Sequence, residues 1–392
     1  MQKVAFKTEK VKNLLEKVKG QRKVPKGSYF ELGKYKIVDQ GEGFINGYTN
    51  DESLLYKGPM PVVVFGDHTC RLKFLKHSFC LGADGTQLMF TKKLNQTYFY
   101  YALKSLDFKI SAYQRHYKLI KEKSILYPEN KETQTRIASV LSSYDDLIEK
   151  NEKRIKILGE MAQLLYMEWF VKFKFPGYEK VKMVDSGTDY GMIPVGWKVV
   201  EMRSVAKIID CLHTKKPKQI ETGRNLFLQL ENILDNGMIN FSSTYYISDE
   251  DYKKWTSNIE LREGDCVVTN VGRIAASAQI PNGVIAAAGR NMTVIRPEKI
   301  PASFLIQYLH SRHMEKEVSR KTDAGAIMGS LNVKNIYLLK VLIPDNSLLE
   351  NYSNLVSIWR NEANTLHKDN FILSQTRDLL IPQLVTGKRE LK

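Results

Sequence analysis

Two long helical stripes at matching places constrain this fold more than any other feature. Apolar side chains recur in steps of four and three over residues 137–169, and the same spacing returns 215 positions later, over residues 352–384. This spacing is typical of a helix that buries a narrow stripe against a second helix. The first stripe consists of Ile137, Leu141, Tyr144, Ile148, Asn151, Ile155, Leu158, Ala162, Leu165 and Trp169. The second consists of Tyr352, Val356, Trp359, Ala363, Leu366, Asn370, Leu373, Arg377, Leu380 and Leu384.

Flanking residues predict where the second helix begins and ends. Ser347 and Glu350 follow Pro344 with the spacing of a capping box. Pro382 should end the regular helix, which would leave Leu384 as a loose last contact. The first stripe covers 33 residues, which at 1.5 Å per residue makes a helix of about 50 Å.

Two related units in one chain can pack about a pseudo-twofold axis, and this would set the two helices antiparallel. The register is testable because each stripe contains one amide, Asn151 and Asn370, which should then pair. The same symmetry pairs Ile155 with Leu366, Leu158 with Ala363, Ala162 with Trp359, Leu165 with Val356 and Trp169 with Tyr352. The alternative is that each stripe packs only on its own domain.

The segments before each stripe have the composition of small mixed domains. Short apolar runs at 35–38, 61–65 and 88–90 are typical of strands, and 98–103 indicates a helix. Related steps follow at 266–269 and 292–295, with a predicted helix over 303–317. We therefore predict an α+β chain: two mixed α/β domains separated by a long antiparallel two-helix coiled coil with a pseudo-twofold repeat. The expected segments are a first domain at 1–128, a central helix at 129–176, a second domain at 177–345 and a C-terminal helix at 346–392.

Charge and cysteine content narrow the class of partner and compartment. The chain has 392 residues and a net charge of +16, and residues 1–128 hold 23 basic against 11 acidic side chains. An excess of this size favours a polyanion such as nucleic acid, although a generally basic soluble surface is the plainer explanation. Four cysteines without a Cys-x-x-Cys pair, no secretory segment and no long apolar run predict a reduced, cytoplasmic protein that does not enter a membrane.

Motifs for catalysis on nucleic acid are missing from the sequence. It has no phosphate-binding Gly-x-x-x-x-Gly-Lys-Ser/Thr loop and no Asn/Asp-Pro-Pro-aromatic tetrapeptide of amino-methyltransferases. His310, His313 and Glu317 could share one face of a helix, but paired surface histidines are commoner than such metal sites. We therefore expect a chain that binds without catalysing, with no catalytic residue, no metal and no cofactor of its own.

Five segments resemble one family, and together they extend over nearly the whole chain. Residues 164–178, Leu-Leu-Tyr-Met-Glu-Trp-Phe-Val-Lys-Phe-Lys-Phe-Pro-Gly-Tyr, are similar to the end of the central helix in specificity subunits of type I restriction–modification enzymes. Residues 191–197, Gly-Met-Ile-Pro-Val-Gly-Trp, resemble the entry to their second target-recognition domain, and 377–387 resemble their terminal helix. Residues 65–69 with 82–86 are like one subclass of recognition domain.

The resemblance implies two recognition domains on an antiparallel helical spacer, each reading half of a split double-stranded DNA target. It also implies two methyltransferase subunits that use S-adenosylmethionine, and restriction (translocase) subunits for cleavage, so the chemistry would reside on the partners. The chain departs from a symmetric pattern, because the first domain lacks the Ile-Pro-x-Gly-Trp entry and the second has Val271-Gly272-Arg273 where the first has Phe65-Gly66-Asp67. The two half-sites should therefore differ.

Candidate DNA contacts are basic, amide and aromatic side chains near glycine-rich loops, because these groups contact phosphates and base edges. In the first domain they are Lys34, Lys36, Asn46, Tyr48, Asn50, Asp67, His68, Arg71, Lys73, Tyr113, Arg115, His116 and Lys118. In the second they are Lys215, Lys216, Lys218, Arg224, Tyr245, Tyr246, Asn270, Arg273, Arg290 and Asn291. For any single residue, surface solubility is an equal alternative.

Two other classes of function stay open at this point. One is a structural adaptor whose helices join proteins without DNA, and the other is a modification enzyme that needs no partner. A spacer that sets the gap between half-sites predicts that four residues inserted near 150–154 lengthen that gap.

Overall fold

The computed structural model describes residues 5–18, 22–107, 115–321 and 330–391. Contacts divide the chain into two compact units. Unit 1 comprises the chain up to Ile148 together with the chain from Ile372, and unit 2 comprises Glu149–Phe371. None of the helices that the structure describes is both long and apolar enough to cross a membrane.

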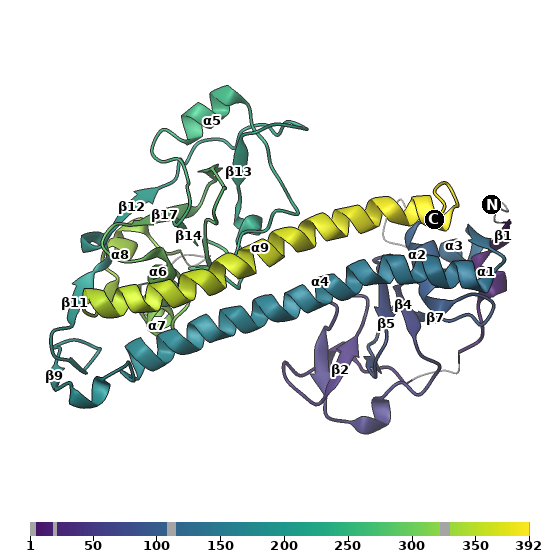
Figure 1. Cartoon of the computed structure of the whole chain (residues 1–392), viewed down its shortest axis with the longest axis horizontal. Helices are drawn as coiled ribbons and strands as arrows, with labels where there is room; N and C mark the ends of the chain where they lie inside the picture. Colours follow the sequence, from purple (N-terminus) through teal and green to yellow (C-terminus); the bar gives the residue numbers. More distant parts are fainter. Residues whose placement is uncertain (1–4, 19–21, 108–114, 322–329, 392) are drawn as a thin grey trace. The chain divides into compact units, whose positions relative to one another are not determined.

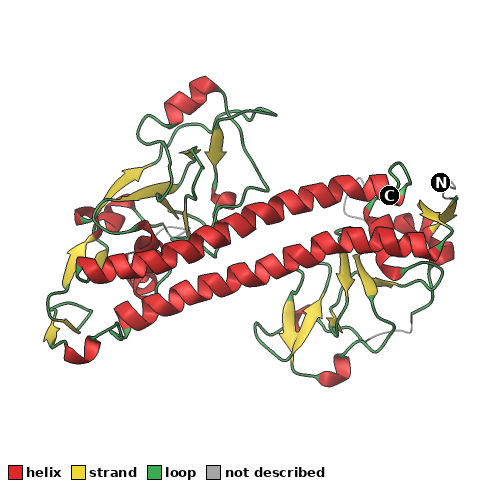
Figure 2. Cartoon of the chain, viewed as in Figure 1, coloured by secondary structure: helices red, strands yellow, loops and turns green. Residues whose placement is uncertain are grey.

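Unit 1 contains three small sheets with short helices (Figures 1 and 2). Strand β4 lies between β5 and β7 and is antiparallel to both, β2 pairs antiparallel with β3 and parallel with β6, and β1 pairs with β8. The elements are β1 Phe6–Lys10, α1 Val11–Leu14, β2 Tyr35–Val38, β3 Gly47–Thr49, β4 Val62–Gly66, β5 Leu72–Leu75, β6 Cys80–Leu81, β7 Thr86–Met89, α2 Gln96–Lys104, α3 Tyr117–Glu122 and β8 Ser124–Pro128.

Unit 2 contains a four-stranded sheet of order β12-β17-β14-β15, a parallel pair β13 and β16, and the antiparallel pairs β11–β18 and β9–β10. The elements are β9 Met183–Asp185, β10 Met192–Pro194, β11 Lys198–Glu201, β12 Ala206–Asp210, β13 Leu226–Leu228, α5 Asp249–Trp255, β14 Cys266–Thr269, β15 Ser277–Gln279, β16 Ala286–Ala288, β17 Met292–Pro297, α6 Ala302–Leu309, α7 Arg312–Lys321, α8 Val333–Tyr337 and β18 Lys340–Ile343.

The two units repeat one topology, so the duplication predicted from the sequence is present. In unit 1 the central strand β4 pairs with β5 and β7, and in unit 2 the central strand β14 pairs with β15 and β17. The parallel pair β2–β6 corresponds to β13–β16, and the antiparallel pair β1–β8 corresponds to β11–β18. Each unit then leads into one long helix, α4 Lys131–Tyr166 or α9 Asn346–Val385.

Within unit 2, α4 and α9 lie side by side and run in opposite directions (Figure 1). The Nδ2 group of Asn151 donates a hydrogen bond of 2.8 Å to Oδ1 of Asn370, which is the amide pair that the antiparallel register predicts. Farther along, the rings of Trp169 and Tyr352 have centroids 6.0 Å apart, as the same register requires. The hydroxyl of Tyr352 also donates to the carbonyl of Ala162 at 3.3 Å.

The seam is shielded from solvent in both units, because no predicted seam position is exposed. Ile155, Leu158 and Ala363 belong to one buried cluster, and Leu366 packs against it. The predicted seam residues, all buried or half-buried, are Ile137, Leu141, Ile148, Asn151, Ile155, Leu158, Leu165, Trp169, Tyr352, Val356, Trp359, Leu366, Asn370, Leu373 and Leu380.

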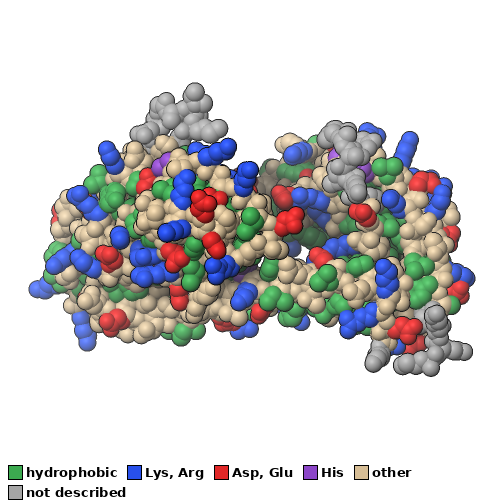
Figure 3. Space-filling view, turned by 90° about the horizontal axis from the view of Figure 1, so that it is seen from above, with side chains coloured by type: hydrophobic (Ala, Val, Ile, Leu, Met, Phe, Trp, Pro, Cys, Tyr) green, Lys and Arg blue, Asp and Glu red, His purple; other side chains and the backbone are tan. Residues whose placement is uncertain are grey.

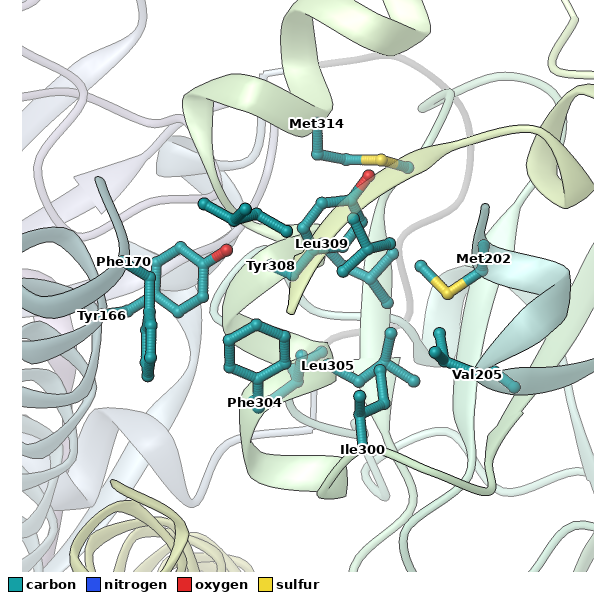
Figure 4. Packing of buried hydrophobic residues seen from close by; sticks show 14 of the residues in the cluster. Tyr166, Phe170, Met202, Val205, Ile300, Phe304, Leu305, Tyr308, Leu309 and Met314 are labelled. Atoms are coloured by element: carbon teal, nitrogen blue, oxygen red, sulfur yellow. The ribbon is translucent and has the colours of Figure 1, made fainter. Parts of the chain in front are cut away.

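The helices also pack on the mixed domains, so both packing modes considered for the stripes occur together. In unit 2, Tyr166 at the end of α4 and Phe170 in the π-helical turn that follows it (Met167–Val171) lie beside Phe304 of α6, with ring centroids 5.5 and 5.0 Å from that ring (Figure 4). In unit 1, Ile137 and Leu141 share a buried core with the strands and with α2. Each helix thereby joins its partner helix to a sheet-bearing domain.

Three predicted helix boundaries are wrong. The helix expected over 303–317 is two helices, α6 and α7, which are interrupted at Ser311. The hydroxyl of Ser311 accepts from the N–H of Met314 in the first turn of α7 and so caps that helix. Helix α9 is capped by Asp345, not Ser347, since its Oδ1 accepts from the N–H of Leu348 at 2.9 Å. The helix also continues past Pro382 to Val385.

The continuation past Pro382 has a tertiary cause. Leu384 and Val385 are 2% and 1% exposed, in the core of unit 1, and the hydroxyl of Tyr98 donates to the carbonyl of Val385 at 3.0 Å. This burial outweighs the loss of one backbone hydrogen bond at the proline. Leu384 is therefore a firm contact and not a loose one.

Candidate nucleic-acid interface

In unit 1, four loop segments form one hydrogen-bonded surface. They are the β2–β3 connection from Gln40 to Asn46, the β4–β5 turn from Asp67 to Cys70, the β6–β7 turn from Gly82 to Gly85, and the segment that leads into α3 from Arg115. All four carry or adjoin residues that the sequence singled out. Their backbones are joined by side chains that are themselves partly or fully buried.

Asp67 joins three of these segments. Its backbone N–H donates to the carbonyl of Gly85 at 2.7 Å, and its Oδ1 accepts from the N–H of Tyr117, also at 2.7 Å. Its carbonyl accepts from the N–H of His116 at 2.8 Å. Gly85 is required here, because its φ is +66° and a Cβ would lie 2.8 Å from Cδ2 of His68.

Lys73 and Gln40 attach the remaining segment. The Nζ group of Lys73 donates to the carbonyl of Gly43 at 2.5 Å and to Oδ1 of Asn46 at 2.9 Å. Burial lowers the pKa of Lys73, while the nearby Asp39 acts in the opposite direction. Gln40 accepts from the N–H of His68 through Oε1 and from the Thr69 hydroxyl through its carbonyl.

Four of the predicted contact residues are buried. Asp67, Lys73, His116 and Asn270 are 4%, 6%, 1% and 9% exposed, and all four bond within the protein. Residue type and loop position predict contact with DNA, whereas in this structure the four side chains are mostly shielded from solvent and bond to neighbouring loops. Tyr113 lies outside the described residues.

Other candidates are accessible. The exposed ones are Lys34, Lys36, Asn50, Arg71, Arg115, Lys118, Lys215, Lys216, Lys218, Arg224, Arg273 and Arg290, and the half-buried ones are Asn46, Tyr48, His68, Tyr245, Tyr246 and Asn291. Three of the exposed cations pair with acids: Arg71 with Glu42, Arg224 with Asp249, and Arg273 with Asp235. Arg273 also donates to two backbone carbonyls, so its guanidinium is largely committed within the protein.

A cavity of about 270 Å³ in unit 2 is lined in part by Lys216, Arg290 and Asn291. Lys216 and Arg290 are 74 positions apart in the sequence. The ammonium of Lys216 lies 4.1 Å from the centre of the Tyr245 ring, whose hydroxyl donates to the carbonyl of Pro217 at 2.7 Å. This ring fixes the lysine-bearing segment by a cation–π contact and a hydrogen bond.

The turn that presents Arg290 cannot vary freely. A Cβ at Gly289 would lie 2.3 Å from the carbonyl oxygen of Leu228, so only glycine is accommodated there. Arg290 is exposed and forms no ion pair in the part of the chain that the structure describes, and the same holds for Lys215 and Lys218. These cations are therefore available to an external anion.

Basic side chains do not form one continuous stripe on the face that Figure 3 shows. Lysines and arginines are interspersed there with acidic side chains. A mixed surface of this kind implies that binding of a polyanion would depend on particular loops and not on net charge alone.

Sequence reasoning missed Gln40, and it did not predict that Asp67 and Lys73 are buried and bond to neighbouring loops. The signal for Asp67 was the turn after a buried strand, but the sequence could not show that this turn faces inward. Gln40 carried no signal, because its importance comes from two hydrogen bonds to a segment 28 and 29 positions away.

Comparison with known proteins identifies relatives of one kind. Two curated relatives, the specificity subunits of the type I restriction enzymes MjaIX and MjaVIII from Methanocaldococcus jannaschii, are 25% and 26% identical over 276 and 284 residues, which are 69% and 67% of this chain. The chain matches 61% of the length of each. No family model matches the chain.

A solved structure has the same fold. It is the S subunit of a type I restriction–modification system from M. genitalium, which superimposes with a TM-score of 0.56 at 16% identity and covers 100% of this chain and 98% of that one. The resemblance to specificity subunits of type I restriction–modification enzymes, which the sequence motifs indicated, is thus shown by the curated relatives that this chain matches.

Proposed function

We propose that this chain is the DNA sequence-specificity subunit of a type I restriction–modification system and has no catalysis of its own. The observation that carries the proposal is the doubled architecture: one loop-bearing α/β topology occurs twice, each copy leading into one helix of an antiparallel pair. The similarity to curated specificity subunits supports the same conclusion.

In this proposal, residues 1–128 and 177–345 form two target-recognition domains, and residues 129–176 and 346–392 form the spacer. Each domain reads one half of a split, asymmetric double-stranded DNA target. The accessible loop cations supply phosphate contacts, and neighbouring amides and arginines read base edges. The half-sites differ because the loops differ: Arg290 and Lys216 surround a cavity in unit 2, whereas Asp67 and Lys73 organise the loops of unit 1.

The spacer would set the number of unread base pairs between the half-sites. Helices α4 and α9 are 36 and 40 residues long, which corresponds to about 54 and 60 Å at 1.5 Å per residue. Two half-sites on one face of B-DNA lie about 34 Å apart, centre to centre, and helices of this length are sufficient for that separation.

The partners follow from the same proposal. Two methyltransferase subunits, which carry S-adenosylmethionine, and restriction subunits would assemble on this chain and supply the chemistry. Exposed apolar side chains on the long helices, including Ile157, Leu164 and Ile358, are 54–65% exposed and are consistent with protein contacts there.

Sequencing of modified bases in the host genome, with and without this gene, tests the proposal. We expect one split motif to lose its methylation when the gene is deleted and to regain it with the wild-type gene. Complementation with the double variant Lys216→Ala/Arg290→Ala should reduce methylation at that motif, whereas Lys253→Ala, an exposed lysine on α5, serves as the matched control. An unchanged methylation pattern after deletion would contradict the proposal.

Two measurements separate the alternatives. An adaptor that only joins proteins would show no sequence preference for duplex DNA, whereas a recognition subunit should bind with a steep salt dependence and retain a preference for its motif. Methyl transfer by the isolated chain would instead indicate a modification enzyme that needs no partner.

A further inference from the structure

A carboxylate, a thiol and an imidazole meet at the end of strand β12. Asp210 is the last residue of the strand, Cys211 follows it, and His213 is two positions further. One oxygen, the sulfur and one ring nitrogen of these side chains all lie within 4.8 Å of one another. No other group of three such side chains is this close together in the part of the chain that the structure describes.

Only one oxygen of the Asp210 carboxylate has a hydrogen-bond partner among the described residues. Its Oδ2 lies 3.0 Å from Nε2 of His213, but Oδ1 is buried and has no hydrogen-bond partner among the described residues. A buried carboxylate oxygen without a donor or a cation is costly. The contact with His213 gives one oxygen of Asp210 a partner, although a surface pair of this kind stabilises a protein little. It accounts for neither the unpartnered second oxygen nor the position of the Cys211 thiol.

Cys211 is buried at the end of β12. The residue is 6% exposed, and its sulfur lies within 4.8 Å of a carboxylate oxygen of Asp210 and a ring nitrogen of His213. Zinc binds cysteine as the thiolate, at a bond length of about 2.3 Å.

The backbone around these groups is fixed on two sides. Strands β12 and β17 are paired with Asp210 opposite Thr293, and the N–H of Cys211 bonds to the carbonyl of Met292 at 3.3 Å. Asn291, which directly precedes β17, has a left-handed φ of +61°. Asp210 and Cys211 are thus held at the end of β12, beside β17, before any ion binds.

We propose that Asp210, Cys211 and His213 bind one Zn²⁺ ion through one oxygen, one sulfur and one nitrogen, with a fourth position open to water. Sulfur and imidazole ligands favour zinc over magnesium or calcium, which prefer oxygen alone. Bonds of about 2.0–2.1 Å at a tetrahedral ion place oxygen and nitrogen ligands about 3.3 Å apart. The Asp210–His213 separation of 3.0 Å needs only a small change to reach that value.

The ion would fix the start of the segment that carries Lys215, Lys216 and Lys218. Cys211 is buried, whereas His213 is exposed, so the site joins the end of a strand to the first turn of that loop. Zinc binding would therefore restrict the conformations of the loop. The chain would bind zinc by itself, independently of DNA binding.

Metal titration of the full-length chain, reduced and stripped of metal, tests the proposal. With Co²⁺ as the probe we expect one equivalent to bind and to give thiolate-to-metal charge-transfer absorption, which one equivalent of Zn²⁺ then removes. Cys211→Ser should abolish this absorption. His213→Ala should weaken the affinity at least about tenfold, since loss of outer-shell partners alone costs about 10- to 100-fold.

The controls change another thiol, which is half-buried, and another exposed imidazole. These variants, Cys70→Ser and His77→Ala, should bind as the wild-type chain does. Circular dichroism monitors folding of each variant. If Cys211→Ser does not fold, His213→Ala decides the question, because that side chain is 59% exposed. Absence of the cobalt–thiolate band in the wild-type chain, or wild-type affinity in His213→Ala, would overturn the proposal.

Discussion

The amide pair of the helix seam gives the most direct test of the fold. Asn151 is 9% exposed, and its Nδ2 donates to Oδ1 of Asn370 at 2.8 Å. Replacing only Asn370 by leucine leaves a buried amide facing a hydrocarbon, which costs about 1–3 kcal/mol. Because Asn370 is itself half-buried and water can reach part of the site, we expect about 1–2 kcal/mol, the lower part of that range.

The double substitution is the informative one. Asn151→Leu with Asn370→Leu removes both polar groups and places apolar side chains at adjoining seam positions, so its stability should be near or above that of the wild type. The two changes are therefore strongly non-additive, and the coupling free energy should exceed about 1 kcal/mol.

Thermal unfolding of the four proteins measures this cycle. For a unit of about 150–250 residues, 1 kcal/mol shifts Tm by about 2–4 °C, so the single variant Asn370→Leu should lower the Tm of unit 2 by about 2–8 °C. The double variant should recover most of that loss. Additive losses in the double variant, or a single variant as stable as the wild type, would refute the paired-amide register. A matched control is Thr365→Leu, an exposed position of the same helix.

The remaining predictions address other parts of the molecule. Burial lowers the pKa of His310, His313 and His367 in unit 2 below 6.5. The unfolded chain therefore binds more protons than the folded chain, so the stability of unit 2 should be fully present above pH 6.5 and fall as the pH drops below it. Calorimetry should show a weaker pH dependence of stability for His310→Gln. The side chain of Arg377 is 13% exposed and pairs with Asp145. Arg377→Met should therefore destabilise unit 1 by about 2–4 kcal/mol in urea unfolding. The control Arg389→Met, at an exposed position beyond α9, should have no such effect. Lys215→Ala and Lys218→Ala should each reduce the slope of log affinity against log salt by about 1 without changing the preferred DNA motif; a changed motif would assign them to base recognition. Inserting seven residues, one heptad, into both α4 and α9 preserves the seam and adds about 10 Å, so the unread gap should lengthen by about three base pairs; an unchanged gap in the methylated motif would refute the spacer proposal.

Much of the architecture could be predicted from local pattern, but the roles of individual loop residues could not. The seam followed from periodicity, since a 4-3 spacing leaves few partners other than a second helix with the same spacing. The central strands β4 and β14 followed from short apolar runs. By contrast, Asp67 and Lys73 have the residue types of DNA contacts, and the sequence could not show that both are buried and bond to neighbouring loops.

Distance in the sequence explains the rest of what was missed. The interior position of Pro382 in α9 depends on burial of the following turn in unit 1, a tertiary effect that outweighs local propensity. The cavity beside Lys216 and Arg290 exists because a loop and a strand start separated by 74 positions fold together. The Asp210, Cys211 and His213 group is local in sequence, yet lacks the paired cysteines by which zinc sites are usually noticed.

The sequence by itself determined the two helices, their antiparallel register and the duplication, because helical periodicity and a repeated spacing are properties of the chain read in order. The tertiary structure alone decided which loop side chains face solvent, which face inward, and where a helix continues past a proline. Those outcomes depend on burial and on partners far away in the sequence, and neither is encoded in the identity of a residue and its immediate neighbours.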